Sequence, residues 1–199
     1  MDNHKIELHL ALLEIDKASA DILTKPGCDI TPLAASFLKT HQILKILWQR
    51  VLSPVMFYVG FSAPKSVFLL TGDPEAFIKM CRADKVSLES PQQALEYFST
   101  FLEVTRSMSQ LFYQVNSVDE IMWRNNLKEV DAARMRAVKE KYNNLIAPQV
   151  TMIGYRYQVN CHVMQNTDLI ETRAFITASG NIELSSNICE KNLPTAYGA

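Results

Sequence analysis

The stretch that decides the fold is residues 153–163, which reads IGYRYQVNCHV. Apolar side chains occupy its odd positions, whereas glycine and polar side chains occupy its even positions. Alternation with a period of two is typical of a β-strand that buries one face. The stretch therefore predicts one long strand, and we expect Tyr155, Tyr157 and Val159 to face the core.

The residues that follow predict two more strands, which complete a three-stranded antiparallel meander. Residues 166–168 form the first expected turn and lead into a strand over 169–177. Residues 179–181 form the second expected turn. A three-residue loop there pairs Ile176 with Leu184, apolar against apolar, so the turn length and the hydrophobic pattern agree.

The polar face of this meander is the candidate binding surface. A hairpin that closes at residues 166 and 167 sets His162 opposite Glu171 and Asn160 opposite Arg173. A carboxylate beside an imidazole fixes its tautomer and strengthens it as a base. A half-exposed sheet also needs a polar face for solvation, so solvation, binding and catalysis all stay open. The candidate surface consists of Arg156, Gln158, Asn160, His162, Glu171 and Arg173.

A helix over residues 90–106 is expected to form the structural centre of the fold. Ser90 and Gln93 have the spacing of a capping box, and Pro91 fits the first helical position. Its apolar side chains cover more than half of the circumference, which is typical of a buried helix. The predicted class is α+β, with an antiparallel sheet wrapped on this helix. At the level of the fold alone, this arrangement resembles the cystatin-like and NTF2-like rolls, over residues 66–190 at most.

The N-terminal part is expected to be a helical pair over residues 1–54, packed on an α+β domain over residues 55–199. Residues 5–23 suit a helix by length and alanine content, although alternation at the start also suits a strand. A threonine–proline start at residue 31, followed by apolar residues spaced three and four apart, predicts the second helix up to residue 53. His41 lies between apolar residues of this helix, so we expect its polar atoms to be satisfied at an interface.

Shorter elements are expected between these parts. They are strands over 55–61, 67–71 and 111–115 and helices over 74–82 and 131–146. The last of these helices is expected to bury Val138, Tyr142, Leu145 and Ile146.

Composition and charge exclude several classes of function. The 199 residues carry 20 basic and 21 acidic side chains, so the net charge of −1 offers nucleic acid no basic surface. The longest apolar run, residues 55–61, is too short to cross a membrane. The sequence has no glycine-rich phosphate loop, no H-E-x-x-H and no G-x-S-x-G motif. We therefore expect no nucleic acid, membrane, metal or cofactor as a ligand.

The cysteines indicate a reducing compartment. None of them forms a C-x-x-C pair or a zinc-like spacing, and charged residues interrupt the apolar N-terminal stretch, so no signal peptide is expected. Free thiols and a cytoplasmic location follow from this pattern. The four cysteines are Cys28, Cys81, Cys161 and Cys189.

Two classes of function stay open. The absence of catalytic motifs favours a non-catalytic ligand-binding or protein-interaction protein, whose partner is an unknown protein or small molecule, a second copy of the chain included. The alternative is a small cofactor-independent hydrolase or isomerase that uses His162 and Glu171. This alternative requires that both side chains line a cavity.

Overall fold

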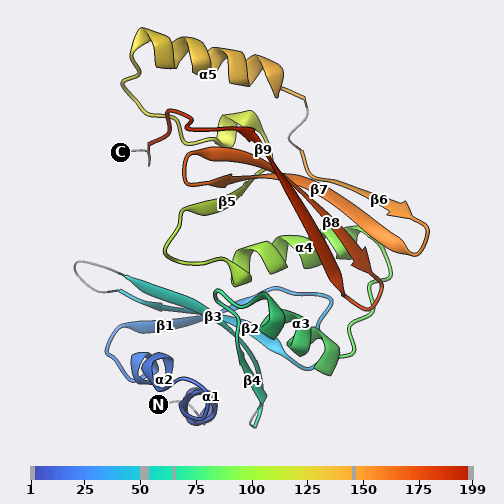
Figure 1. The fold of residues 1–199 in the computed structure, drawn as a ribbon. Coiled ribbons are helices and arrows are strands. Elements are labelled where there is room, and N and C mark those ends of the chain that lie inside the picture. Colours follow the sequence, from blue (N-terminus) through green and yellow to red (C-terminus); the bar gives the residue numbers. More distant parts are fainter. Residues whose placement is uncertain (1–2, 50–53, 65, 145–146, 197–199) are drawn as a thin grey trace. The chain divides into compact units, whose positions relative to one another are not determined.

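A computed structural model describes residues 3–49, 54–64, 66–144 and 147–196 (Figure 1). The fold is α+β, with one antiparallel sheet of four strands and another of five. The chain forms two compact units. The first comprises residues 1–87 and 100–108, and the second comprises residues 88–99 and 109–199. In the described part of the chain, no helix is long and apolar enough to cross a membrane.

The predicted α+β class, the presence of an N-terminal helical pair and the C-terminal meander are confirmed, although both helices of the pair lie within residues 3–23. The predicted division of the chain after residue 54 stays a prediction. A compact unit is a part of the chain whose residues mainly contact one another. Such a unit is not by definition a domain that folds alone.

The first unit begins with two helices, α1 (Asn3–Leu13) and α2 (Lys17–Leu23), over the residues predicted to be helical. Asp16 separates them, because its side chain accepts hydrogen bonds from backbone amides of the first turn of α2 and so caps that helix. Leu8 and Leu23 are fully buried, and they pack in one core cluster with apolar residues of the four-stranded sheet.

The predicted second helix, over residues 31–53, is wrong, because this segment contributes strands to the four-stranded sheet. Ile43 and Ile46 lie on opposite faces of their strand, and both are fully buried. The sequence of a strand that is covered on both faces does not alternate between apolar and polar residues. The spacing of its apolar residues therefore matched a helix as well as a strand. Residues 50–53, Val51 among them, lie outside the described residues. The strands, in the order β1-β2-β3-β4, are β1 (Cys28–Leu33), β2 (Gln42–Trp48), β3 (Val55–Ser62) and β4 (Ser66–Leu69).

Two helices follow, and both were predicted. In α3 (Pro74–Ala83), Asp73 caps the first turn and accepts a hydrogen bond from the amide of Ala76. In α4 (Pro91–Thr105), Ser90 Oγ accepts from the amide of Gln93, but the Gln93 side chain accepts from the amide of Glu89 rather than that of Ser90. The expected burial of α4 is confirmed by Ala94, Tyr97, Phe98, Phe101, Leu102 and Val104.

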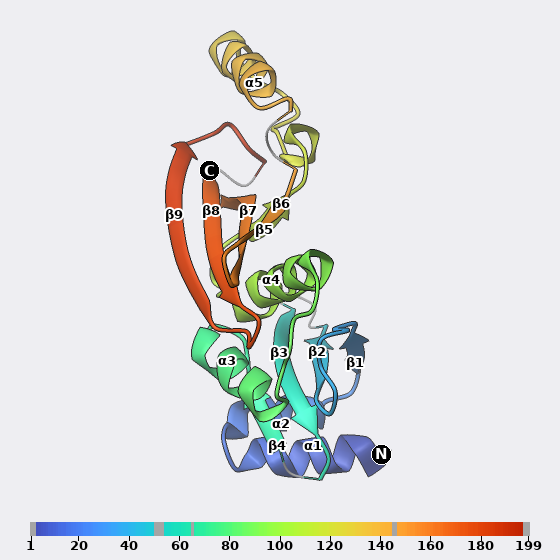
Figure 2. The same ribbon diagram turned by 90° about the vertical axis from the view of Figure 1, so that its right-hand side faces the viewer.

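The second unit is built on the five-stranded sheet. Figure 2 shows β7, β8 and β9 side by side. The strand order is β5-β7-β8-β9, and β6 also pairs with β7. The N-terminal part of α4 belongs to this unit, and Tyr97 Oη donates a hydrogen bond of 2.6 Å to the carbonyl of Gly180. The elements are β5 (Phe112–Val115), η1 (Val118–Glu120), α5 (Glu129–Lys141), β6 (Gln149–Ile153), β7 (Arg156–Gln165), β8 (Asp168–Thr177) and β9 (Ile182–Glu190).

The predicted long strand from residue 153 is in fact a hairpin. Gly154, at a φ of +60°, turns the chain between β6 and β7, and glycine adopts this left-handed conformation without a steric penalty. Tyr155 lies in the turn and is 94% exposed, so the prediction that it faces the core is wrong. Tyr157 and Val159 are buried as predicted. The apolar residues beside Gly154 hid the turn, because they continued the alternation.

The predicted pairing of Ile176 with Leu184 is also wrong. Ile176 pairs with Ile182, and Leu184 pairs with Ala174. The register differs from the prediction by two, and the amide of Thr177 donates to the carbonyl of Asn181 across a loop of residues 178–180. A shift of two residues keeps every side chain on the same face of the sheet. The predicted face of each residue is therefore unchanged by this error.

The helix predicted over residues 131–146 corresponds to α5 and the residues after it. Val138 and Tyr142 are buried as expected. Leu145 and Ile146 lie outside the described residues, so their predicted burial stays a prediction.

Candidate functional site

The polar face of the five-stranded sheet contains a pocket of about 310 Å³. Three residues of the predicted surface line it, namely Asn160 and His162 of β7 and Glu171 of β8. The predicted register is confirmed, because His162 lies directly opposite Glu171 and Asn160 lies directly opposite Arg173. The predicted cross-strand pairs are thus confirmed, whereas the role of these residues in binding stays a prediction.

Other walls of the pocket come from segments that no sequence pattern linked to the meander. Gln149 belongs to β6, Cys189 belongs to β9, and Tyr142 directly follows α5. Tyr142 and Cys189 are apolar in most of their surface, and neither stood out as a candidate in the sequence. Their place in the pocket depends on how the chain returns to the sheet after α5, which periodicity does not reveal.

The remaining residues of the predicted surface, Arg156, Gln158 and Arg173, do not line the pocket. Arg156 forms an exposed ion pair of 2.9 Å with Glu183 of β9. Gln158 Nε2 donates to Asn160 Oδ1 at 3.2 Å, and Arg173 Nε donates to the same oxygen at 3.1 Å. The hydrogen bonds from Gln158 and Arg173 hold the side chain of Asn160 from two sides.

His162 differs from the half-exposed residue that the sequence predicted. It is only 9% exposed, and its buried Nδ1 atom has no hydrogen-bond partner among the described residues. His162 is buried because other side chains cover this end of the sheet. Tyr142 packs its ring edge-on against the imidazole at 6.2 Å, and Val138 and Leu193 belong to the core cluster that adjoins it. A buried polar atom left without a partner costs about 1–3 kcal/mol.

His162 and Glu171 do not form a catalytic pair in this structure. Within the residues described, no hydrogen bond or ion pair joins the two side chains, and the Glu171 carboxylate lies 3.9 Å from the Arg173 guanidinium instead. A general base needs its orienting partner within hydrogen-bond reach. The two residues therefore offer separate polar contacts to whatever occupies the pocket.

The other titratable groups of the pocket are neutral at pH 7. Burial raises the pKa of the Cys189 thiol and of the Tyr142 hydroxyl. At the edge of the pocket, a hydrogen bond from Lys141 lowers the pKa of Glu190, and the two side chains form an ion pair of 2.8 Å. Glu171 is thus the acidic side chain that lines the pocket itself.

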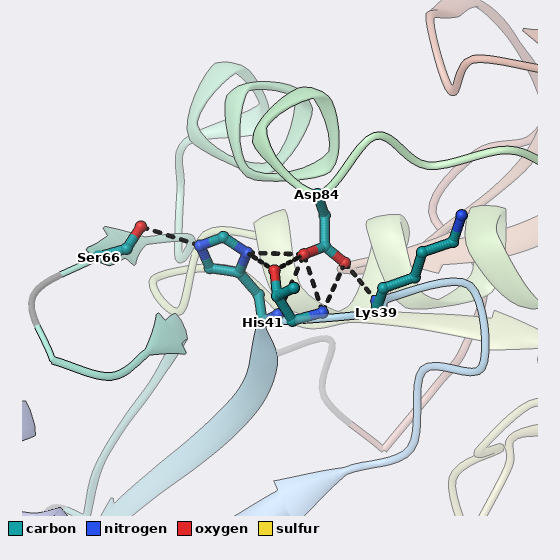
Figure 3. A network of polar contacts seen from close by, with 5 residues as sticks. Lys39, His41, Ser66 and Asp84 are labelled. Atoms are coloured by element: carbon teal, nitrogen blue, oxygen red, sulfur yellow. Dashed lines mark hydrogen bonds and ion pairs between the residues drawn. The ribbon is translucent and has the colours of Figure 1, made fainter.

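A second polar cluster lies in the first unit, and no sequence pattern predicted it. Figure 3 shows the imidazole of His41 between the hydroxyl of Ser66 and the carboxylate of Asp84. His41 Nε2 is 2.9 Å from Ser66 Oγ, and His41 Nδ1 is 3.0 Å from Asp84 Oδ1. The expectation that His41 is satisfied is confirmed, although it precedes a strand and does not lie on a helix. The three residues are far apart in sequence and share no recognisable motif.

Comparisons with known proteins give no functional information on either cluster. No known protein family, no curated protein and no solved structure matches the chain. The resemblance to cystatin-like and NTF2-like rolls therefore stays a prediction. Over the ranges that the structure describes, three or more metal-binding side chains are nowhere grouped together.

Proposed function

We propose that the protein is a non-catalytic binding protein that holds a small polar molecule in the pocket around His162. The observation that carries this proposal is the pocket itself, in which Asn160, His162 and Glu171 come together from two paired strands.

The size of the pocket supports a small ligand. Its volume of about 310 Å³ lies at the lower end of the range for small-molecule sites, which is about 300–1,000 Å³. The buried ring of Tyr142 supplies an apolar wall, and polar side chains lie on the sheet side. An apolar wall with a few converging polar groups is typical of ligand pockets.

The polar groups favour a ligand that donates a hydrogen bond to Glu171 and accepts one from Asn160. Glu171 presents a carboxylate, which only accepts hydrogen bonds when ionised. Asn160 Oδ1 already accepts from Gln158 and Arg173, so its amide nitrogen is the group left for the ligand. We therefore propose a small amine or polyol, rather than a carboxylic acid, as the class of ligand.

The alternative function, a cofactor-independent hydrolase or isomerase that uses His162 and Glu171, stays a prediction. Its requirement for a cavity is met, because both residues line the same pocket. The missing hydrogen bond between their side chains, both of them described residues, nevertheless favours binding over proton transfer.

The cellular location and the partners belong to the same proposal. The four cysteines are all described and are free thiols, which supports a cytoplasmic location. A protein partner, including a second copy of this chain, is the other candidate occupant of the polar face. It would cover the pocket instead of entering it.

The proposal is tested by ligand-observed NMR with three probes: ethanolamine, glycerol and acetate. We expect ethanolamine or glycerol to bind with a Kd on the order of 1 mM, about −4 kcal/mol, and acetate to bind at least about tenfold more weakly. His162→Phe should abolish binding, because it fills the pocket and removes the imidazole. Glu183→Gln is the matched control, since Glu183 lies on the same sheet face but outside the pocket.

Two outcomes would overturn the proposal. The first is that none of the three probes binds the wild-type protein. The second is that His162→Phe, still folded, binds the probes as well as the wild type does, which would place the binding elsewhere on the surface.

A further inference from the structure

We propose that Ser66, His41 and Asp84 form a catalytic triad in the first unit, and that this site hydrolyses small carboxylic esters. The proposal is independent of the ligand pocket in the second unit. It rests on the two hydrogen bonds in Figure 3 that link three side chains. Ser66 begins β4, His41 directly precedes β2, and Asp84 directly follows α3. Both hydrogen-bond distances, 2.9 Å and 3.0 Å, lie in the range that links nucleophile, base and orienting group.

The protonation state of Asp84 fixes the tautomer of His41. Burial raises the pKa of this carboxyl group, but hydrogen bonds from Thr40, His41 and Lys39 outweigh burial and hold the pKa far below its usual range. The ionised carboxylate can only accept, so the proton of a neutral His41 lies on Nδ1. His41 Nε2 then has a free lone pair, and the Ser66 hydroxyl must donate to it. This is the polarity that a nucleophile and its general base require.

Asp84 also holds the imidazole in place, which makes it a positioning residue. It is 4% exposed, and it accepts hydrogen bonds from the amides of Thr40 at 3.0 Å and His41 at 3.1 Å. Phe68 packs edge-on against the imidazole at 5.6 Å. These contacts preorganise the histidine. Anchoring of the loop before β2 explains the bonds to Asp84, but it does not explain the third link, from His41 to a serine on another strand.

A pocket borders the histidine of the triad, although Ser66 is not among its lining residues. Ser66 is half-buried rather than enclosed. His41 lies in the wall of a pocket of about 460 Å³, together with apolar side chains that include Pro32, Leu33 and Ile43. Apolar walls beside the base suit an ester whose acyl or alcohol group is short and apolar.

The reaction balances with water as the second substrate. Ser66 Oγ attacks the ester carbonyl carbon while its proton passes to His41 Nε2. The bond from that carbon to the alcohol oxygen then breaks, and His41 returns the proton to the departing alkoxide. Water attacks the acyl group on Ser66 and gives a proton to His41. The acyl bond to Ser66 Oγ breaks, Ser66 regains its proton from His41, and the carboxylic acid leaves.

The decisive experiment uses the full chain and two probes, a fluorophosphonate that labels activated serines and p-nitrophenyl acetate. We expect mass spectrometry to find the label on Ser66, and Ser66→Ala to lower ester hydrolysis by about 100-fold or more. Ser62→Ala is the matched control. Ser62 faces Ser66 across the β3–β4 hairpin and is equally half-buried, and no hydrogen bond links it to His41 in the part of the chain described. Its labelling and hydrolysis should equal those of the wild type.

A second variant separates positioning from simple stability. Asp84→Asn should lower kcat by about 100-fold or more and leave KM unchanged, because the wrong tautomer of His41 blocks proton transfer but not binding. A loop that had merely loosened would raise KM as well. The proposal is overturned if Ser66 carries no label in the folded wild type, or if Ser66→Ala hydrolyses the ester as fast as Ser62→Ala does.

Discussion

His162 of β7 lies directly opposite Glu171 of β8, yet over the residues that the structure describes the two side chains share no hydrogen bond. Both line the same pocket. The register of the sheet thus brings an imidazole and a carboxylate to one cavity without a hydrogen bond between them. This relationship is the basis for the proposed binding function.

Removal of the Phe98 side chain should destabilise the protein severely. Phe98 of α4 is fully buried, so Phe98→Ala loses the transfer free energy of the ring and leaves a cavity. We expect the free energy of unfolding, measured with urea, to fall by about 3–5 kcal/mol. Tyr155→Ala is the control, because Tyr155 is exposed, and it should change stability by less than about 0.5 kcal/mol. Similar unfolding midpoints for the two variants would show that α4 is not buried.

The hydroxyl of Tyr97 should stabilise the turn between β8 and β9. It donates a buried hydrogen bond of 2.6 Å to the carbonyl of Gly180. Tyr97→Phe leaves that carbonyl without this partner. We therefore expect the free energy of unfolding to fall by about 1–3 kcal/mol. Tyr155→Phe, which removes an exposed hydroxyl, should have no measurable effect. If both substitutions leave thermal unfolding unchanged, the hydrogen bond contributes nothing to stability.

The close approach of β3 and α3 at Gly60 should exclude any side chain there. A Cβ atom on Gly60 would lie 2.1 Å from the sulfur of Met80, which is fully buried. Gly60→Ala should therefore destabilise the protein by about 1–3 kcal/mol. In a Met80→Ala background the space is free, and the same substitution should be much less harmful. Equal effects in both backgrounds would contradict this explanation.

Asp84 should make stability depend on pH in the acid range. Its pKa is lowered in the folded state, so its contribution is fully present above the unfolded value of about 4 and is lost as pH falls toward the folded pKa. We expect the wild type to lose more stability than Asp84→Asn between pH 5 and pH 3, as measured by urea unfolding at each pH. Identical losses would show that the carboxylate is not stabilised in the folded state.

The C-terminal sheet could be predicted because polar and apolar residues alternate along β7 and β8. The period of two in β7 and β8, together with the turn at residue 166, was enough to pair His162 with Glu171. The same reasoning failed at β2, where Ile43 and Ile46 are buried on opposite faces. It also failed at Tyr155, because one glycine between apolar residues gave too weak a turn signal.

The candidate sites were predictable only where one pair of strands forms them. His162 and Glu171 follow from the local register, whereas Tyr142 reaches the pocket through the packing of the chain after α5. Ser66, His41 and Asp84 come from three separate segments, and the helix predicted around His41 obscured their proximity. Long-range packing decides such clusters, and hydrophobic periodicity carries no information about it.

The most direct test of the binding proposal is the imidazole signal of His162 in a ¹H–¹⁵N NMR titration with ethanolamine and glycerol. We expect saturable shifts of the His162 nitrogens, with the ring nitrogens of His4, His9 and His41 unmoved and the His162→Phe spectrum serving for assignment. If His162 stays unmoved while either probe binds, or if neither probe shifts it at any concentration, the pocket is not the binding site.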